Sequence, residues 1–544
     1  MTAPKVGGAF RSRAMLGFLI ALGSGIGGGA AAQTPPEQVT PDQTTIEQPP
    51  APEGTATQAP PTQGQAPQTR PWTISPSVTV QESITDNVRL VPTGREADLI
   101  SAVTPDLSVS GQTRRLNMSL DANLTYDKYL NATDMDGIQY GVSGYGNADL
   151  VDQLLFLDLR SAIDVQYLTR NGITSAIARV LPNNQAEVLN NSVSPYLRHS
   201  FGDWASGELR YTLASVDYAN ASAGMPASPA ASLAQAANLA NSLTNEYTVG
   251  LHSGPEFGRF SWGLDGDYNQ SSYSAQRQID QTTETAAIEY AVVRGIGLIG
   301  KLGYDAYKDN GILGMDTANP SWRLGLHLTP GPRSSLTVEA GRRFGGAYWA
   351  GNLYYKFSPT LRLDASHDIA QTTQQAQLSA ALNNLVPNSL GRLVSPITGL
   401  PASPNQQLFS YTSQSYLQKT SRATLSGQRG LTTVVVGITY QQNDMGTVSL
   451  GQGPLETQTI AEVDVSVIYQ LNQQSDIHLM GTASRLFDSI TSSDDTIRQV
   501  SLSYDYKLSP SLTGSLSYSY YALNDRIGTG YGENVFLVSL QKGF

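Results

Sequence analysis

Apolar and polar residues alternate with a period of two through most of the chain beyond Trp72. In the stretch RLNMSLDANLTY, Leu116, Met118 and Leu120 share one face. Asn117 and Ser119 share the other. Such alternation predicts β-strands with one apolar and one polar face. It recurs in LLFLDLRSAIDVQY, FSWGLDGDY, LIGKLGYDAY, SWRLGLHL, TIAEVDVSVIYQL, VSLSYDYKL and LTGSLSYSYY. The polar face of the first of these carries too many charges for the core of a soluble sandwich.

The connections between the predicted strands alternate between short and long. The short turns are GQT, GDW, GPEFG, PGPRS, SPT, QRG, NQQS and SPS. The longer loops are residues 168–187, 219–243, 308–320, 371–411 and 442–456. This asymmetry is typical of outer-membrane barrels, which have short periplasmic turns and long extracellular loops. The segments number about 22, within a range of about 20 to 24 strands, and an even number places both ends of a barrel in the periplasm.

The pattern therefore predicts an all-β fold, a transmembrane antiparallel β-barrel of the outer-membrane type over residues 72–544. Beyond Gln33 there is no second run of about 20 apolar residues, so a closed barrel is the form in which the chain would cross a membrane. With strands about 4.8 Å apart and tilted by about 40°, the backbone would enclose a lumen roughly 40 Å across. Wall side chains alone would not fill it.

The first 71 residues divide into two segments. Lys5, Arg11 and Arg13 precede the apolar run MLGFLIALG, and Ala30–Ala32 form a small-residue cleavage site. Residues 1–32 are therefore predicted to be a signal peptide. Residues 33–71 are rich in Pro, Gln and Thr and predict a disordered periplasmic segment, either a spacer or a docking site for peptidoglycan or a partner.

Composition narrows the classes of function. The chain has no cysteine, which excludes disulfides, thiolate metal sites and a cysteine nucleophile. Its net charge of −11 argues against nucleic acid as a partner. Charged residues make up 15% of the chain and the mean hydropathy is −0.23, values compatible with a wall that is wet on one side and apolar on the other.

The chain ends on the alternating stretch NVFLVSLQKGF. Phe536, Val538, Leu540 and Phe544 share one face and predict the signal by which barrel-assembly machinery recognises the last strand. Tyrosine outnumbers phenylalanine, 27 to 12. Many tyrosines lie near the ends of predicted strands and are expected at the membrane interfaces. These tyrosines are Tyr126, Tyr167, Tyr211, Tyr268, Tyr469, Tyr504 and Tyr520.

Three stretches carry a resemblance to a known family: WTISPSVTVQESITDNVRL, ADLISAVTPDLSVSG and PGPRSSLTVEAGRRFGG. They resemble the PEP-CTERM-system-associated outer-membrane proteins, also called putative β-barrel porin type 2. The resemblance covers most of residues 72–544 and implies an outer-membrane barrel linked to exopolysaccharide secretion. It supplies no catalytic residues. Residues 371–411 are long for the family pattern.

The chemistry-bearing residues do not form a recognisable catalytic or metal motif. The five histidines, His199, His252, His327, His367 and His478, lie on separate predicted strands without a metal-ligand spacing. The sequence lacks a G-x-S-x-G nucleophile motif, and its glycine clusters do not open helices as phosphate-binding loops do. We therefore expect no catalytic site, cofactor or metal.

The polar face is the candidate functional surface. Its predicted lumen-facing charged residues are Asp121, Asp127, Asp158, Arg160, Asp164, Glu208, Arg210, Asp265, Asp267, Lys301, Asp305, Glu339, Arg343, Lys356, Arg362, Asp364, Glu462, Asp464, Asp505 and Lys507. Cross-strand ion pairs among them would stiffen the wall, and an acidic excess would bias a conduit against anions. The apolar residues within 371–411 predict that this loop folds inward as a constriction; a cap over the mouth is the alternative.

Together these observations predict a porin-like barrel in the bacterial outer membrane that forms a polar conduit, linked through the resemblance to exopolysaccharide export. Its expected partners are outer-membrane lipid, the barrel-assembly machinery, and a polysaccharide or small polar solute. A non-conducting structural or docking barrel of an export complex is the alternative. An outer-membrane hydrolase is the third.

Overall fold

The computed structural model describes residues 72–168, 174–177, 179, 184–222, 239–274, 276–311, 316–387, 393–394, 415–445, 457–488, 494–524 and 530–544. The expected signal peptide, residues 1–32, and the expected periplasmic segment, residues 33–71, lie outside these residues.

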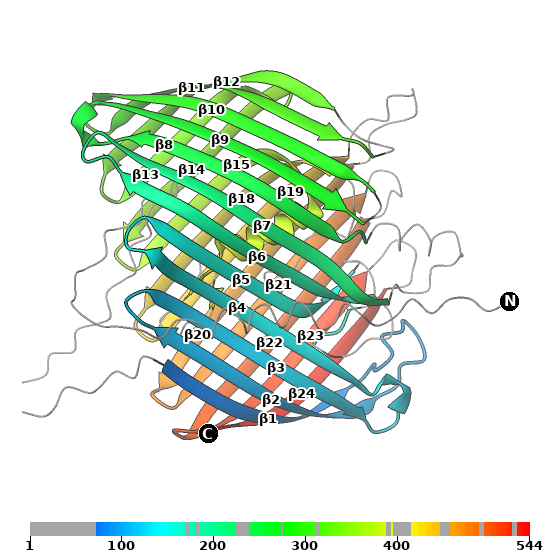
Figure 1. Cartoon of the computed structure of the whole chain (residues 1–544). Helices are drawn as coiled ribbons and strands as arrows, with labels where there is room; N and C mark the ends of the chain where they lie inside the picture. The colour runs from blue at the N-terminus through cyan, green and yellow to red at the C-terminus, as the bar shows by residue number, and fades with distance from the viewer. Residues whose placement is uncertain are drawn as a thin grey trace, which may run out of the picture. The chain divides into compact units, whose positions relative to one another are not determined.

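Within the described residues, the chain forms one antiparallel sheet of 22 strands in which the last strand pairs with the first (Figure 1). The strands are β1 Trp72–Thr85, β2 Asp98–Gln112, β3 Leu116–Tyr129, β4 Gly137–Val151, β5 Leu155–Tyr167, β6 Gln185–Ser200, β7 Ala205–Ser222, β8 Ser242–Ser253, β9 Phe260–Tyr273, β10 Gln278–Val293, β11 Ile296–Asp309, β12 Thr317–Gly331, β13 Ser334–Arg343, β14 Gly346–Ser358, β15 Leu361–Thr373, β18 Ser415–Arg429, β19 Thr432–Met445, β20 Thr457–Asn472, β21 Ser475–Asp488, β22 Asp494–Ser509, β23 Leu512–Asn524 and β24 Tyr531–Gly543. Each strand pairs with its neighbours in chain order, so the sheet is a closed meander, and the predicted fold and strand number are confirmed.

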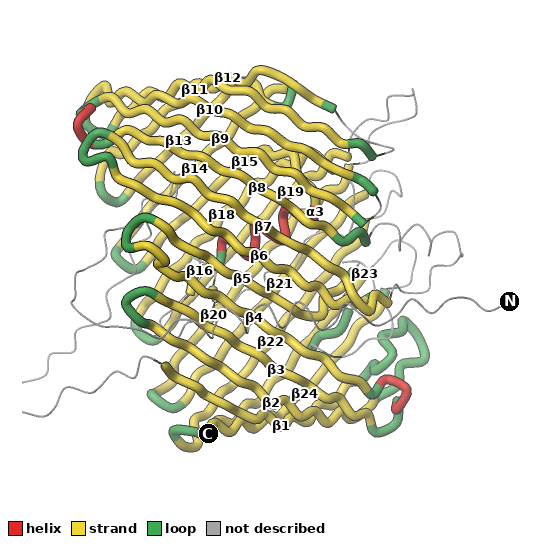
Figure 2. Tube along the Cα trace, viewed as in Figure 1, coloured by secondary structure: helices red, strands yellow, loops and turns green. Residues whose placement is uncertain are grey.

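Five short elements of the described residues lie outside this sheet. The 3₁₀ helices η1, Thr133–Met135, and η2, Pro255–Phe257, lie in hairpin connections. Helix α3, Gln374–Asn384, follows β15 directly (Figure 2). The strand β16, Val386–Pro387, pairs with β17, Leu393–Val394. No helix in the described part of the chain is long and apolar enough to span a membrane.

The two ends of the barrel differ in their connections. One end carries the connections that follow β2, β4, β6, β8, β10, β12, β14, β18, β20 and β22, and we call it the turn end. We call the opposite end the loop end. The turn-end connections are short, as predicted. The loop end carries the long connections, but β13 and β14 are joined there by Phe344 and Gly345 alone. Both residues have positive φ, 50° and 77°, as a two-residue hairpin turn requires. The expected alternation of short and long connections is therefore wrong at this hairpin.

The two faces of the sheet differ in chemistry. On β1, the apolar side chains Val80 and Ile84 are exposed, whereas the alternate residues Ser83 and Thr85 are buried. We call the face of exposed apolar side chains the outer face and the opposite one the inner face. Because the strands of a membrane barrel alternate apolar-out and polar-in, this arrangement is that of an outer-membrane barrel.

Aromatic side chains lie on the outer face near both ends of the strands. Tyr126, Tyr268, Tyr469 and Tyr504 are exposed there, as the interfacial positions predicted from the sequence require. Tyr167 differs, because it packs against a buried apolar cluster at the loop end instead.

Candidate functional site: the inner face of the barrel

The predicted lumen-facing charged residues lie on the inner face. On β5, for example, Asp158, Arg160 and Asp164 alternate with Leu157 and Leu159, and the same parity holds on the other strands that carry them. The structure brings many of them together in ion pairs and leaves others apart.

One group of ion pairs spans β11, β12 and β13. The Lys301 ammonium lies 2.7 Å from one Glu339 oxygen, and the Arg323 guanidinium lies 3.6 Å from the other. Arg343 donates to both carboxylate oxygens of Asp305, at 2.8 and 3.2 Å. Glu339 and Asp305 are buried, so these pairs are sheltered from solvent screening and fix three neighbouring strands to one another.

A second group lies on β5, β6 and β7 toward the turn end. Glu208 accepts from Arg198 at 2.7 Å and pairs with Arg210 at 2.9 Å. The Arg210 guanidinium also lies 3.9 Å from the centre of the Tyr196 ring, which stacks on Phe156. The result is an aromatic and guanidinium surface on the inner wall.

The remaining predicted residues have other surroundings. Arg362 pairs with Asp364 at 2.7 Å, and Asp265 lies 3.3 Å from His252. Asp267 lies beside Glu246 of the neighbouring strand. In the described part of the chain, the aspartates Asp265, Asp267, Asp464 and Asp505 form no ion pair with a lysine or an arginine. The lysines Lys356 and Lys507 form no ion pair with a carboxylate there. Asp121, Asp127, Asp164 and Glu462 all have polar partners.

Helix α3 packs on the inner face. Its Leu378 is fully buried against Val188 of β6 and Val216 of β7. Val188 has the opposite parity on β6 to Val193, which is exposed on the outer face, so Val188 lies on the inner face. Leu382 is fully buried against Ala162 of β5. The segment after β15 therefore turns into the barrel, and we call residues 374–387 with 393–394 the inward segment.

Hydrogen bonds from the wall hold the helix. The Arg160 guanidinium donates to the carbonyl oxygens of Leu382 and Leu385, at 3.0 and 2.6 Å, while Asp158 accepts from the same guanidinium at 2.9 Å. The Asn190 amide donates to the Leu378 oxygen at 2.7 Å. The last carbonyls of a helix lack partners within the helix, so Arg160 satisfies groups that would otherwise be buried without one.

Within residues 371–411, which we predict to constrict the lumen, residues 371–373 belong to β15, and residues 388–392 and 395–411 lie outside the described residues. The docking surface itself was missed by the sequence reasoning. Its signal is a loss of alternation: in AEVLNN, Val188 and Leu189 are adjacent apolar residues, so both faces of β6 are apolar there.

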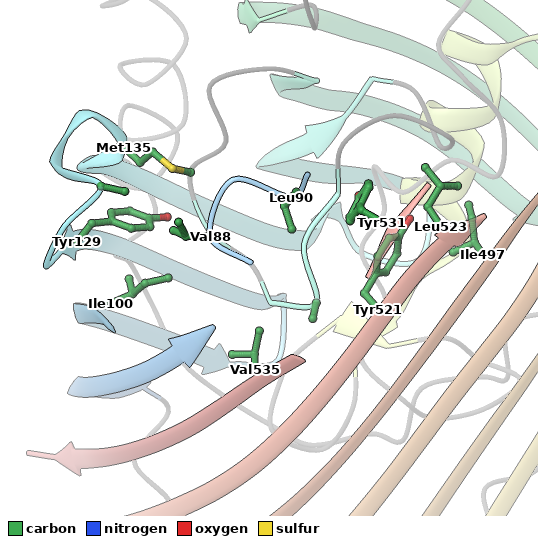
Figure 3. Close-up of a cluster of buried hydrophobic side chains, with 12 residues drawn as sticks. Val88, Leu90, Ile100, Tyr129, Met135, Ile497, Tyr521, Leu523, Tyr531 and Val535 are labelled. Carbon is green, nitrogen blue, oxygen red and sulfur yellow. The ribbon is translucent and has the colours of Figure 1, made fainter. Parts of the chain in front are cut away.

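A second buried cluster lies on the inner face at the loop end, where β24 pairs with β1. Val88 and Leu90 from the β1–β2 connection pack with Tyr129, Tyr521 and Val535 (Figure 3). Arg179, from the β5–β6 connection, donates to Glu533 at 2.8 Å and to the Val88 carbonyl at 2.8 Å.

Ionic contacts also join the loop-end connections at the surface. Both terminal nitrogens of Arg89 donate hydrogen bonds to the Asp134 carboxylate, at 3.0 and 2.9 Å. The hydrogen bond from Arg89 holds the pKa of Asp134 below its usual range. The β1–β2 and β3–β4 connections are thereby linked.

One serine–histidine pair bears on the question of catalysis. His367 Nδ1 lies 2.8 Å from Ser421 Oγ on the neighbouring strand, and the imidazole stacks on Trp349. The other ring nitrogen, Nε2, is buried with no partner among the described residues. A hydrolytic triad needs a third group that orients the base, so this pair lacks one of the elements of that chemistry.

Comparison with known proteins matches part of the chain to a family. The family model for putative beta-barrel porin 2 matches residues 68–229. No curated protein matches the chain.

Two solved structures that match the chain are a receptor and a transporter. The siderophore receptor PirA from Acinetobacter baumannii has 9% sequence identity and a TM-score of 0.43, with 87% of this chain and 81% of that chain covered. The FrpB iron transporter from Neisseria meningitidis has 9% identity and a TM-score of 0.48, with 88% and 82% covered. Similarity this low does not indicate what this chain binds.

Proposed function

We propose that the protein is a restricted conduit for polar solutes across the outer membrane, with the inward segment as its constriction. The observation that carries this proposal is the docking of α3 on the inner wall through Arg160 and Asn190. A barrel of 22 strands is too wide for wall side chains alone to fill. A helix held at one side of the wall narrows such a lumen without filling it.

The charges on the inner face support passage of polar solutes rather than apolar ones. Ion pairs such as Lys301–Glu339 and Arg343–Asp305 line β11, β12 and β13. Polar and charged groups on a pore wall favour hydrated solutes.

We further propose that the solute is a saccharide or an exported polysaccharide. The resemblance noted in the sequence motivates this, and the family match over residues 68–229 is to a porin-type barrel. The inner wall also offers suitable groups: the flat face of Phe156 can contact the C–H face of a sugar ring, and Arg198 and Glu208 can hydrogen-bond its hydroxyls.

A non-conducting docking barrel is the second candidate. The apolar cluster at the loop end favours it, because connections from the β1 side of the β1–β24 seam are held on the inner face there against β22, β23 and β24. In such a barrel the inward segment would be a structural filling rather than a constriction.

Single-channel conductance of the purified mature protein in planar bilayers tests the two candidates. We compare the wild type, Arg160→Ala, and a variant in which residues 374–411 are replaced by a short Gly/Ser linker. Arg343→Ala is the matched control, because Arg343 is an inner-face arginine on β13 that pairs with Asp305 of β11, and α3 packs on other strands. A conduit predicts larger conductance in both altered proteins and none of that change in the control.

Silence of all four folded proteins would overturn the conduit and favour the docking barrel. Unchanged conductance in an open wild-type channel after the linker replacement would overturn the constriction. If the channels conduct, block by oligosaccharides but not by uncharged polymers of similar size supports the saccharide proposal.

A further inference from the structure

Two aspartates and a histidine meet on the inner face near the turn end. Asp476 and His478 lie two residues apart on β21 and therefore share a face. Asp505 on β22 is the direct cross-strand neighbour of Asp476. His478 Nε2 lies 3.2 Å from an Asp476 oxygen and 3.7 Å from an Asp505 oxygen, and the three ligand atoms lie within 4.8 Å of one another.

The electrostatics of this group differ from those of the inner-face carboxylates that form salt bridges with arginine or lysine. Asp305, Glu339, Asp158 and Glu208 each pair with an arginine or a lysine. Among the described residues, the ion-pair partner of both Asp476 and Asp505 is His478.

Like charges directly opposite each other on neighbouring strands destabilise a sheet. An imidazole, unlike a guanidinium, is not permanently charged at neutral pH. Lys507, on the same face of β22, forms no ion pair with either carboxylate. Among the described residues, the juxtaposition of Asp476 and Asp505 therefore lacks a salt bridge to a permanent counter-charge.

We propose that Asp476, His478 and Asp505 bind a divalent cation of the zinc and first-row transition-metal class. One such ion would coordinate one atom from each residue at about 2.0 to 2.2 Å after small rotations of the side chains. The single imidazole ligand favours these metals over Ca²⁺ and Mg²⁺, which prefer oxygen ligands throughout. The side chains are about one-third exposed, at 34, 33 and 32%, so an ion can enter from the lumen and keep water in its open positions.

The bound ion would have two consequences. It would neutralise the paired carboxylates and so join β21 to β22 at the turn end. It would also remove two negative charges from the wall there, which lowers any preference of the lumen for cations. The proposal departs from the sequence-based expectation of no metal, because that expectation did not include the strand register that brings Asp505 to Asp476.

Isothermal titration of Zn²⁺ into the tag-free, refolded mature protein tests the site. The wild type is expected to bind one Zn²⁺ ion. His478→Ala and Asp505→Asn should bind Zn²⁺ with an affinity at least tenfold lower than that of the wild type. His252→Ala is the matched control, because His252 lies on the inner face beside the single carboxylate of Asp265. It should keep the wild-type titration.

Each variant is first checked for the folded barrel by circular dichroism, and Asp476→Asn replaces any variant that does not fold. Equal Zn²⁺ binding by the wild type and His478→Ala would overturn the proposal. So would Ca²⁺ binding as tight as Zn²⁺ binding in the wild type, because an all-oxygen site would then suffice. The thermal midpoint gives a second readout: Zn²⁺ should raise it in the wild type and the His252 variant and not in the His478 variant.

Discussion

Arg179 and Glu533 form a salt bridge in which the arginine side chain is 1% exposed and the glutamate 0%. Their terminal atoms lie 2.8 Å apart, although the residues are separated by most of the chain. Arg179 also donates to the Val88 carbonyl, and Glu533 accepts from Thr85 and from the amide of Ala176. Since β1 and β24 pair with each other, this network fastens two loop-end connections across the seam where the barrel closes.

We predict that Arg179→Ala destabilises the barrel. Removal of one partner leaves Glu533 as an uncompensated buried charge, which typically costs about 3 to 5 kcal/mol in the free energy of unfolding. Urea titration of the protein refolded into vesicles measures it. Arg485→Ala is the control, because Arg485 is exposed in its pair with Asp494 and solvent screens such a pair, so its loss should change the free energy of unfolding little. Equal decreases in the free energy of unfolding of the two variants would contradict the claim that the burial of the Arg179–Glu533 pair sets the cost.

The fold was accessible from the sequence because its signals are local. The alternation in stretches such as Leu116–Tyr126, and the turn residues between them, require no knowledge of distant contacts. The parity of each strand also places charged residues such as Arg160 on the face opposite the exposed apolar residues.

The contacts those side chains make could not be predicted in the same way. That Arg160 donates to carbonyls of α3 depends on a helix more than two hundred residues away. The meeting of Asp476 with Asp505 depends on the register of β21 against β22, which a shift of one residue would abolish. The position of Arg179 depends on the path of a connection that carries no periodic pattern.

The packing of α3 gives a second prediction. Leu382→Ala removes a fully buried side chain from the contact with Ala162 and Leu385, a change that typically costs about 2 to 5 kcal/mol. Since the sheet hydrogen bonds are unaffected, the loss should appear as undocking of the helix rather than as unfolding of the barrel. Hydrogen exchange of the amides in residues 374–384 measures it, and these amides should exchange faster.

Val386→Ala is the control for this change, because Val386 belongs to the same segment but is exposed. Unchanged exchange of those amides in Leu382→Ala, or an equal increase in both altered proteins, would mean that the contact of Leu382 with the wall does not hold the helix.

The ion pairs on β11, β12 and β13 give a third prediction. Glu339→Gln removes the negative partner of Lys301 and Arg323 and leaves two positive charges on the inner wall. If the lumen conducts, its permeability should shift toward anions. The reversal potential in a KCl gradient measures the shift. Glu82→Gln is the control, because Glu82 lies on the outer face of β1, and an equal shift there would contradict an effect through the lumen.

The last prediction concerns Phe544, which we expect the barrel-assembly machinery to recognise. Its ring is 76% exposed, and the bond that fixes its position is made by the backbone, with the amide donating to the Pro76 carbonyl at 3.0 Å. Phe544→Ala should therefore change the free energy of unfolding by no more than about 0.5 kcal/mol, as is usual for exposed positions. Assembly into outer-membrane vesicles that contain the machinery should be slower, while spontaneous folding into detergent should keep its rate.

Phe260→Ala separates recognition from a general interfacial effect, because Phe260 is an exposed aromatic residue at the turn-end start of β9. If both variants assemble equally slowly, the terminal ring acts only as a membrane anchor, and recognition must lie in Phe536, Val538 and Leu540 or elsewhere.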